Sequence, residues 1–321
     1  LRAASVERPE IEMTNLVNLL KGASERFGPS TALTISMGIR QQRWSYRMLW
    51  DMSGRVAALL QGHGLVKGDR AIIWAPNRPE RAAAFFGCLR AGVVVVPLDV
   101  RSTPDFVARI VEQTEPKLAF LSQQTARDLQ GSTFPQVSLE DLEELVEGVI
   151  PAGDDVSVDG EDIAEIMFTS GTTGDPKGVV LTHRNIASNV EAASQVITIK
   201  PSNRLLSLVP LSHMLEQTGG LLVPLSNGAS VVYPISRQPR VIFKTIRTNR
   251  ITNLVLVPQV LQIFMNAMER EVRAKGKERQ WRLLLRLAPL LPTRARRWLF
   301  RPVHRQLGGR LSLVMSGGSS L

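Results

Sequence analysis

Residues 169–178 combine the chemical groups that a polyphosphate-binding loop needs. The stretch reads TSGTTGDPKG and follows the apolar run 163–168, which we expect to form a buried strand. Glycine lets backbone N–H groups approach an anion closely, and consecutive N–H groups form an anion-binding concavity. Hydroxyl groups add hydrogen-bond donors, and a lysine adds positive charge. The candidate phosphate-binding residues are Thr169, Ser170, Gly171, Thr172, Thr173, Gly174 and Lys177.

Two other interpretations of this stretch are less consistent with the sequence. A Ser/Thr/Gly-rich segment can be an ordinary flexible surface loop. Here, however, the segment directly follows a buried strand, and Pro176 restricts the backbone. The common ATPase loop reads Gly-x-x-x-x-Gly-Lys-Ser/Thr, whereas here Pro176 precedes Lys177 and Gly178 follows it. We therefore expect a phosphate-binding loop of another kind.

Composition narrows the class of protein. The chain has 321 residues, of which 44% are hydrophobic and 21% charged, so we expect a globular protein with more than one compact unit. The single cysteine, Cys88, excludes an internal disulfide framework, and with only four histidines a zinc site is not expected. A net charge of +10 favours anionic partners. No nucleic-acid-binding motif accompanies this charge, so nucleic acid is not an expected partner.

Neither a signal peptide nor a transmembrane run is recognisable, so we expect a cytoplasmic protein. The first residue, Leu1, indicates a processed or trimmed chain. Segment 270–310 is rich in arginine interleaved with tryptophan and leucine. One interpretation is a helical patch in peripheral contact with an anionic membrane. The other, which we favour, is a pair of surface helices whose apolar faces pack on the domain.

The order of expected elements predicts an α/β fold. Apolar runs typical of strands alternate with segments that have helical periodicity, which is the pattern of doubly wound, mostly parallel sheets. We expect strands at 70–75, 93–98, 117–121, 163–168, 204–209, 229–233 and 252–257, with helices between them at 79–91, 183–197 and 240–249. The interval 122–162 is expected to be surface loop, with a capping box at 138–141 that starts a short helix.

The loop and its continuation VVLTH at 179–183 resemble the signature of the adenylate-forming enzymes, which include acyl-CoA synthetases, luciferases and adenylation domains. Segment 210–216, PLSHMLE, is similar to the segment that lines the carboxylate end of their acyl pocket, which implies that His213 orients the carboxylate. Segment 307–321 resembles the long-chain acyl-CoA synthetase branch, with Ser-Ser at 319–320 where that branch commonly has Ala-Pro. It implies an acyl and adenine pocket bordered by His213, Gly317, Gly318 and Ser319.

The resemblance implies a fold and a reaction. It predicts the large N-terminal domain of an adenylate-forming enzyme, truncated before its barrel and its mobile C-terminal domain. Its expected division is 1–65, which joins the second α/β subdomain; 66–200, the first subdomain, with the phosphate loop; and 201–321, the incomplete second subdomain, with the basic helical segment 270–310.

The expected reaction is ATP-dependent activation of a medium- or long-chain fatty acid to acyl-adenylate and then acyl-CoA. ATP, Mg²⁺ and CoA take part, His213 and Lys177 are the candidate catalytic residues, and Thr169 is the candidate magnesium ligand. Residues 1–321 alone are expected to bind ATP weakly and not to turn over. Alternatives are a fatty acyl-AMP ligase or acyl-carrier-protein synthetase, and a non-catalytic nucleotide-binding or membrane-associated module. Oligomeric state stays open.

Overall fold

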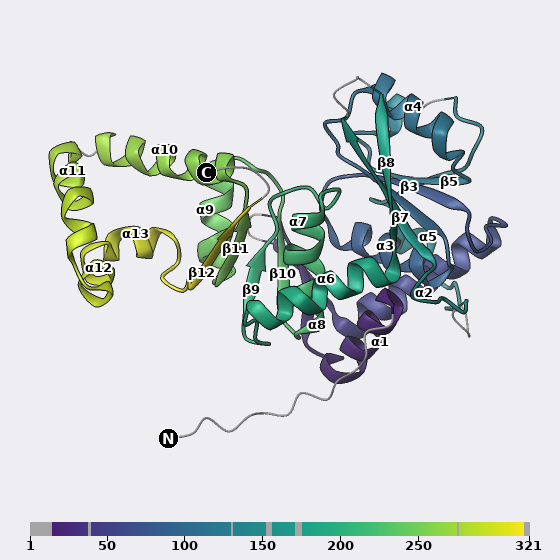
Figure 1. Cartoon of the computed structure of the whole chain (residues 1–321), viewed down its shortest axis with the longest axis horizontal. Helices are drawn as coiled ribbons and strands as arrows, with labels where there is room; N and C mark the ends of the chain where they lie inside the picture. Colours follow the sequence, from purple (N-terminus) through teal and green to yellow (C-terminus); the bar gives the residue numbers. More distant parts are fainter. Residues whose placement is uncertain are drawn as a thin grey trace.

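The computed structural model describes residues 15–37, 40–129, 131–151, 156–170, 175–274 and 276–317. They form two six-stranded sheets with helices on both faces, so the expected α/β fold with two mostly parallel sheets is confirmed (Figure 1). Sheet 1 has the strand order β6-β5-β3-β4-β7-β8, and sheet 2 has the order β12-β11-β9-β10-β1-β2. Each sheet is parallel except for one antiparallel edge strand, which is β8 in sheet 1 and β2 in sheet 2.

The strands of sheet 1 are β3 (Arg70–Trp74), β4 (Val94–Leu98), β5 (Leu118–Leu121), β6 (Gln136–Ser138), β7 (Ile163–Ser170) and β8 (Pro176–Thr182). Those of sheet 2 are β1 (Thr31–Met37), β2 (Arg40–Ser45), β9 (Arg204–Leu206), β10 (Ser230–Pro234), β11 (Asn253–Leu256) and β12 (Leu313–Ser316). The longer helices are α1 (Leu16–Phe27), α2 (Tyr46–Gly62), α3 (Pro79–Arg90), α4 (Pro104–Thr114), α6 (His183–Val196), α9 (Pro239–Thr248), α10 (Pro258–Ala274) and α11 (Glu278–Leu287). The short ones are α5 (Leu142–Leu145), α7 (Met214–Glu216), α8 (Val223–Ser226), α12 (Thr293–Leu299) and α13 (Arg301–Gln306).

Three apolar clusters hold these layers together. The largest lies between the sheets, where β1 and β10 of sheet 2 and β3 and β4 of sheet 1 pack on helices α1, α2, α3 and α6. A second cluster covers the outer face of sheet 1 beneath α4, and a third covers the outer face of sheet 2 beneath α9 and α10. Burial on both faces explains why strand 94–98 is an uninterrupted apolar run. The strands of residues 31–45 join sheet 2, while the three-part domain division stays a prediction.

Local sequence signals explain where several helices begin. The side chains of Ser45, Thr103 and Thr182 each accept a hydrogen bond from a backbone N–H group in the first turn of the following helix. Thr182 and Asn185 form a reciprocal capping box at the start of α6. The capping box expected at 138–141 was wrong: Ser138 ends strand β6, and Asp141 makes no side-chain cap. The carboxylate of Glu140 pairs instead with Arg78, a tertiary contact that local spacing does not predict.

The arginine-rich segment forms an arm that extends away from sheet 2 through α10, α11, α12 and α13 (Figure 1). Its base is packed, since Phe264 of α10 is buried against α9. Farther out, no residue of α11 is buried, so the expectation that its apolar face packs on the domain was wrong. Trp281 contacts Phe300 within the arm itself, with ring centroids 5.8 Å apart. Among the described helices, none combines the length and the apolar character needed to cross a bilayer.

Candidate active site

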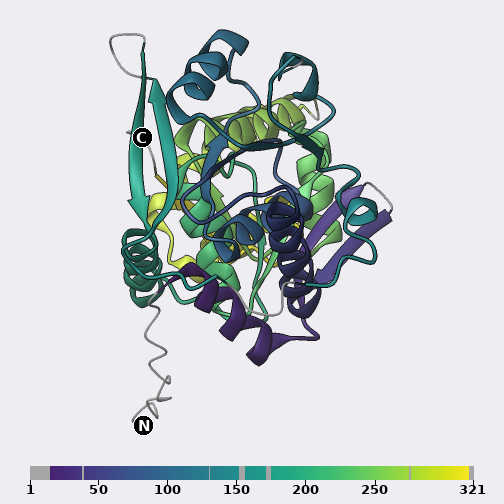
Figure 2. The same ribbon diagram turned by 90° about the vertical axis from the view of Figure 1, so that its right-hand side faces the viewer.

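Strands β7 and β8 flank the candidate phosphate-binding loop and pair in an antiparallel hairpin along one side of the molecule (Figure 2). The pairing register places Thr169 opposite Lys177 and Ser170 opposite Pro176. Side chains directly opposite each other in such a pair share one face, with Cβ atoms about 5 Å apart. The side chains of Thr169 and Lys177 are both exposed. The hairpin therefore presents a hydroxyl and an ammonium group side by side at the two ends of the loop.

The middle of the loop lies outside the described residues, and with it the predicted phosphate-binding residues Gly171, Thr172, Thr173 and Gly174. The described part agrees with the expectation of a strand before the loop, although β7 extends two residues farther than expected. The strand after the loop, β8, was not predicted. Its Val179 and Val180 are exposed at the edge of the sheet.

The carboxyl ends of β4 and β7 meet at one edge of sheet 1. These neighbouring strands run parallel, with Val95 in register with Glu165. Four residues beyond this pair lie Asp99 on one chain segment and Thr169 on the other. Adjacent strands lie about 4.8 Å apart, so both residues leave the sheet at the same edge. This is the edge at which parallel α/β sheets bind their ligands.

His213 contacts this edge from sheet 2. Its Nε2 atom lies 3.4 Å from Oδ2 of Asp99, and the imidazole is 53% exposed whereas the carboxylate is 15% exposed. Burial alone would raise the pKa of Asp99, but contacts with His213 and Arg101 outweigh burial and hold this pKa well below its usual range. Asp99 therefore stays ionised and supplies a fixed negative charge beside His213.

Asn77 fixes the chain segment that leads to His213. The Asn77 side chain donates to the hydroxyl of Ser207 at 2.9 Å and to the carbonyl of Val209 at 2.7 Å. Its carbonyl oxygen accepts from the backbone N–H of Leu211 at 2.9 Å. Asn77 follows β3 of sheet 1, whereas the segment that it binds follows β9 of sheet 2. One amide side chain thus ties the predicted acyl-pocket segment to the sheet that holds the phosphate loop.

Gly317 lies next to the same segment. A Cβ atom built on Gly317 would be 3.7 Å from Cδ1 of Leu215, two residues after His213. The backbone N–H of Gly317 donates to the carbonyl of Leu256 at 3.2 Å, which extends the pairing of β11 and β12. The structure therefore brings Gly317 close to the His213 segment. Gly318 and Ser319 lie outside the described residues.

The sequence alone did not reveal two of these contributors, Asp99 and Asn77. Asp99 directly follows β4 and Asn77 lies three residues after β3, and this position beyond the carboxyl end of a buried parallel strand is the signal that could have singled them out. The cation beside Asp175, Arg109 of α4, was also missed; its Nη1 atom lies 3.2 Å from Oδ1 of that carboxylate. Both partners are exposed, so this pair adds little stability.

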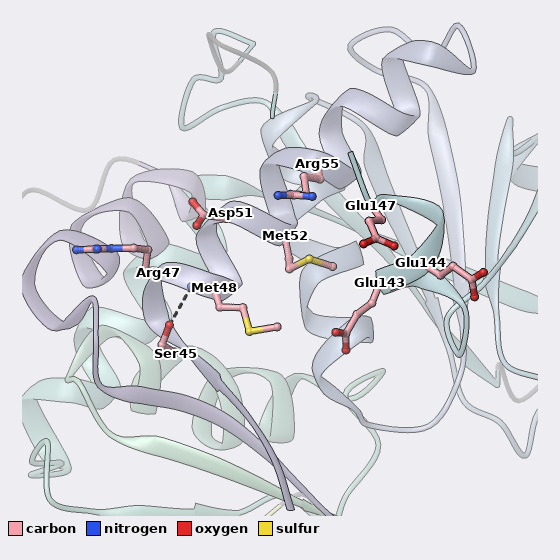
Figure 3. A pocket seen from close by; sticks show the side chains of 9 residues that line it. All are labelled: Ser45, Arg47, Met48, Asp51, Met52, Arg55, Glu143, Glu144 and Glu147. Atoms are coloured by element: carbon pink, nitrogen blue, oxygen red, sulfur yellow. Dashed lines mark hydrogen bonds between the residues drawn. The ribbon is translucent and has the colours of Figure 1, made fainter. Parts of the chain in front are cut away.

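A separate surface cavity of about 620 Å³ lies between α2 and α5 (Figure 3). Two arginines and four carboxylates line it, with three of the carboxylates together on α5 and just after it, and none of its lining residues is a predicted site residue. They are Ser45, Arg47, Met48, Asp51, Met52, Arg55, Glu143, Glu144 and Glu147. The side chain of Arg55 donates to the carbonyl of Val146 and so holds the two helices together. Because the carboxylates outnumber the arginines, the lining of the cavity does not favour an anion such as a polyphosphate.

Both the sequence and the fold are similar to those of known proteins. The sequence profile of the family described as "AMP-binding enzyme" matches residues 21–321. The long-chain-fatty-acid–CoA ligase FadD13 of Mycobacterium tuberculosis is 29% identical over 185 residues, which cover 55% of this chain and 37% of that ligase. A dimodular nonribosomal peptide synthase of Bacillus subtilis is 28% identical over 191 residues, or 59% of this chain and 8% of that synthase.

Solved structures show the same fold. The inhibitor-bound N-terminal domain of FACL13 from Mycobacterium tuberculosis superimposes with a TM-score of 0.71 at 24% identity. That superposition covers 78% of this chain and 65% of the FACL13 domain. The chain thus spans only part of the length of the curated relatives that it matches.

Proposed function

Because the chain belongs to the family of AMP-binding enzymes, we propose that this protein activates a carboxylic acid with ATP. The carboxylate attacks the α-phosphorus of ATP, which forms acyl-adenylate and releases pyrophosphate. The thiol of CoA then attacks the acyl carbon and displaces AMP. A medium- or long-chain fatty acid is the proposed substrate, which the similarity to a long-chain-fatty-acid–CoA ligase supports.

One arrangement carries the proposal: a phosphate-binding hairpin and a histidine–carboxylate pair share one edge of sheet 1. Thr169 and Lys177 lie opposite each other in the hairpin, and Asp99 leaves the same edge with His213 beside it. The attack brings the anionic carboxylate close to the anionic polyphosphate. Catalysis must therefore consist mainly of holding the reactants in line and offsetting negative charge.

Each proposed residue has a distinct task in this step. Lys177 would neutralise charge on the β- and γ-phosphates, together with loop residues 169–174. The imidazole of His213, held by Asp99 at Nε2, would orient the substrate carboxylate toward the α-phosphorus. Gly317–Ser319 would border the acyl and adenine pocket, where the absence of a side chain at Gly317 leaves room beside Leu215.

Mg²⁺ fits this site only as a partner of the nucleotide. Thr169 offers one exposed hydroxyl oxygen, and Mg²⁺ typically takes most of its ligands from phosphates and water. The described residues contain no group of three or more His, Cys, Asp or Glu side chains that could hold a metal by themselves. We propose that Thr169 contributes to magnesium binding. Bound there, the ion would offset charge on the phosphates.

The acceptor of the acyl group is CoA in this proposal, and a carrier protein is the alternative. The similarity to a nonribosomal peptide synthase supports that alternative. The test is to incubate the full-length protein with ATP and a ¹⁴C-labelled fatty acid, and to supply either CoA or a phosphopantetheinylated carrier. Thioester formation with CoA supports the proposal. Thioester formation with the carrier alone would replace it with a carrier-protein ligase.

We place the protein in the cytoplasm and propose peripheral contact with an anionic membrane through the arm. Leu290 and Trp298 are 80% and 73% exposed, and the exposed arginines Arg282 and Arg286 lie one turn apart on α11. Exposed apolar and cationic side chains on neighbouring helical turns are typical of segments that lie on anionic lipid. Such a position would bring the enzyme to its fatty acid.

Sedimentation with vesicles tests this contact. The full-length protein is expected to bind phosphatidylglycerol vesicles, and to bind them less after Arg282→Gln and Arg286→Gln. Arg40→Gln with Arg43→Gln removes the same charge from exposed positions of β2 and serves as the control. Equal loss of binding in both double variants would mean that only net charge matters. A non-catalytic membrane module would bind vesicles but form no acyl-adenylate.

A further inference from the structure

A buried hydrogen bond joins the phosphate-loop strand to the helix that directly follows His213. Nε2 of Gln217 lies 2.9 Å from Oε2 of Glu165, although the residues are 52 positions apart in the sequence. Glu165 belongs to β7, and Gln217 begins the π-helix η2 (Gln217–Leu222) that continues α7. The exposed fractions of Glu165 and Gln217 are 0% and 2%. The contact therefore lies wholly inside the protein, between sheet 1 and the segment that follows β9 of sheet 2.

Both partners connect to site residues through short, rigid paths. The backbone N–H of Gln217 donates to the carbonyl of His213 at 3.0 Å, so the two residues share one helical turn. Along β7, alternate residues face the same side, which puts Thr169 on the face of Glu165, about 13 Å away at 3.3 Å per residue. A shift of Gln217 relative to Glu165 would therefore move His213 relative to the phosphate loop.

Burying a carboxyl group in a protein core carries a desolvation penalty. Burial raises the pKa of Glu165 to about 7, although the hydrogen bond from Gln217 and the positive charge of Arg81 oppose the rise. Apolar side chains of similar size usually stabilise such a position as well or better, whereas a directional polar pair fixes one arrangement. The π-helix adds to this argument, because such wide turns occur frequently at functional sites.

Gly220 of this helix fits the same account. A Cβ atom on Gly220 would overlap the carboxyl group of Glu216, the residue before Gln217. The wide turn and the missing side chain let the helix hold two consecutive polar residues in the interior. Both Glu216 and Gln217 are buried there.

We propose that Gln217 and Glu165 are positioning residues that set His213 at a fixed place relative to the phosphate loop for acyl-adenylate formation. This inference rests on the proposed function, because it assigns the pair a task in that reaction. Neither residue touches the reacting atoms. The pair acts through the backbone of His213 at one end and through β7 at the other.

The test uses the full-length protein and three variants. Gln217→Met keeps the length of the side chain but removes the donor. Glu165→Gln keeps an acceptor oxygen, and the reversed pair Glu165→Gln with Gln217→Glu restores a donor and an acceptor with opposite polarity. Gln262→Met, a glutamine on the exposed part of α10, is the matched control. The readouts are amide hydrogen exchange of residues 211–217 without ligand, and kcat and KM for fatty-acid-dependent ATP–pyrophosphate exchange.

We expect Gln217→Met to raise amide exchange in 211–217 at least tenfold and to lower kcat at least tenfold, with KM for ATP changed less than threefold. Glu165→Gln, the reversed pair and Gln262→Met should stay within threefold of wild type. The inference is overturned if Gln217→Met leaves exchange and kcat within threefold, or if the reversed pair restores slow amide exchange in 211–217 without restoring kcat. If the wild-type protein shows no pyrophosphate exchange, the proposed function fails, while hydrogen exchange still decides whether the pair holds the His213 segment.

Discussion

The imidazole of His213 and the carboxylate of Asp99 lie 3.4 Å apart across the junction of the two sheets. Asp99 follows β4 of sheet 1, and His213 follows β9 of sheet 2, so neither sheet can form this pair alone. Their meeting point is the edge at which β7 leads into the phosphate loop. This relationship makes the site a product of how the sheets pack against each other.

The pair predicts a non-additive effect of substitutions on adenylation. His213→Ala and Asp99→Asn should each lower kcat for acyl-adenylate formation, since the first removes the orienting group and the second removes its support. Because both act through one imidazole, the double variant should be no more than about threefold worse than the poorer single variant. Pyrophosphate release from the full-length protein measures this. Multiplicative effects in the double variant would mean that the two residues act independently.

Asp99 also predicts a pH dependence of stability. Its pKa is lowered in the folded state, so the ionised carboxylate stabilises the fold above its unfolded pKa of about 3.9 and this contribution is lost as the pH falls through the folded value. The free energy of unfolding of wild type should therefore exceed that of Asp99→Asn at pH 6, and the gap should narrow below pH 4. Urea titrations from pH 3 to 6 measure it, with Asp128→Asn as the control for loss of one exposed charge. A gap that does not change with pH would contradict the assignment.

Lys177 predicts a loss of nucleotide affinity. A hydrogen bond to a charged group contributes about 1.5–3 kcal/mol, so Lys177→Met should weaken ATP binding roughly 10- to 100-fold. Lys200→Met, in an exposed loop before β9, should leave ATP affinity unchanged. Titration calorimetry with the full-length protein gives both values. The phosphate-binding role of the hairpin is untenable if the two variants bind ATP equally well.

Two helical glycines predict stability changes of opposite sign. A Cβ atom on Gly87 of α3 would overlap the side chain of Val56 on α2 and lie 3.0 Å from the carbonyl of Ser53. We expect Gly87→Ala to destabilise the protein by about 1–3 kcal/mol through overpacking. A Cβ atom on Gly62, at the end of α2, would meet no atom within 4 Å outside its own helix, and Gly62→Ala should stabilise by up to about 1 kcal/mol. Thermal unfolding of both variants checks the close approach of α2 and α3, and a stabilised Gly87→Ala variant would disprove it.

Strands and helices with strong local signals could be predicted from the sequence. The apolar run at 94–98 and the cap at Thr182 each carry their information in a few adjacent residues. Strand β8 was missed because its first three residues, 176–178, were interpreted as the end of the phosphate loop. Its Val179 and Val180 are exposed, so they do not form the buried apolar run that marks a strand such as β4. The helices of segment 270–310 were expected to pack on the domain, but α11 has no buried residue. Amphipathic periodicity alone does not say which surface an apolar face meets.

The candidate site was predictable only in part, for a physical reason. The loop, His213 and Gly317 were found from motifs that lie within single segments. Asp99, Asn77 and the Glu165–Gln217 pair act through contacts between the sheets. The hydrogen bonds among these contacts join residues that are 52 to 134 positions apart in the sequence. No local pattern contains such contacts, because they arise when the two sheets pack together.

An oxygen-transfer experiment tests the central claim most directly. The full-length protein is incubated with ATP, CoA and a fatty acid whose carboxylate is labelled with ¹⁸O, and the products are analysed by mass spectrometry. If the carboxylate attacks the α-phosphorus and the thiol then displaces AMP, one labelled oxygen must appear in AMP and none in pyrophosphate. Label in inorganic phosphate, or AMP without label, would contradict the formation of an acyl-adenylate by this protein.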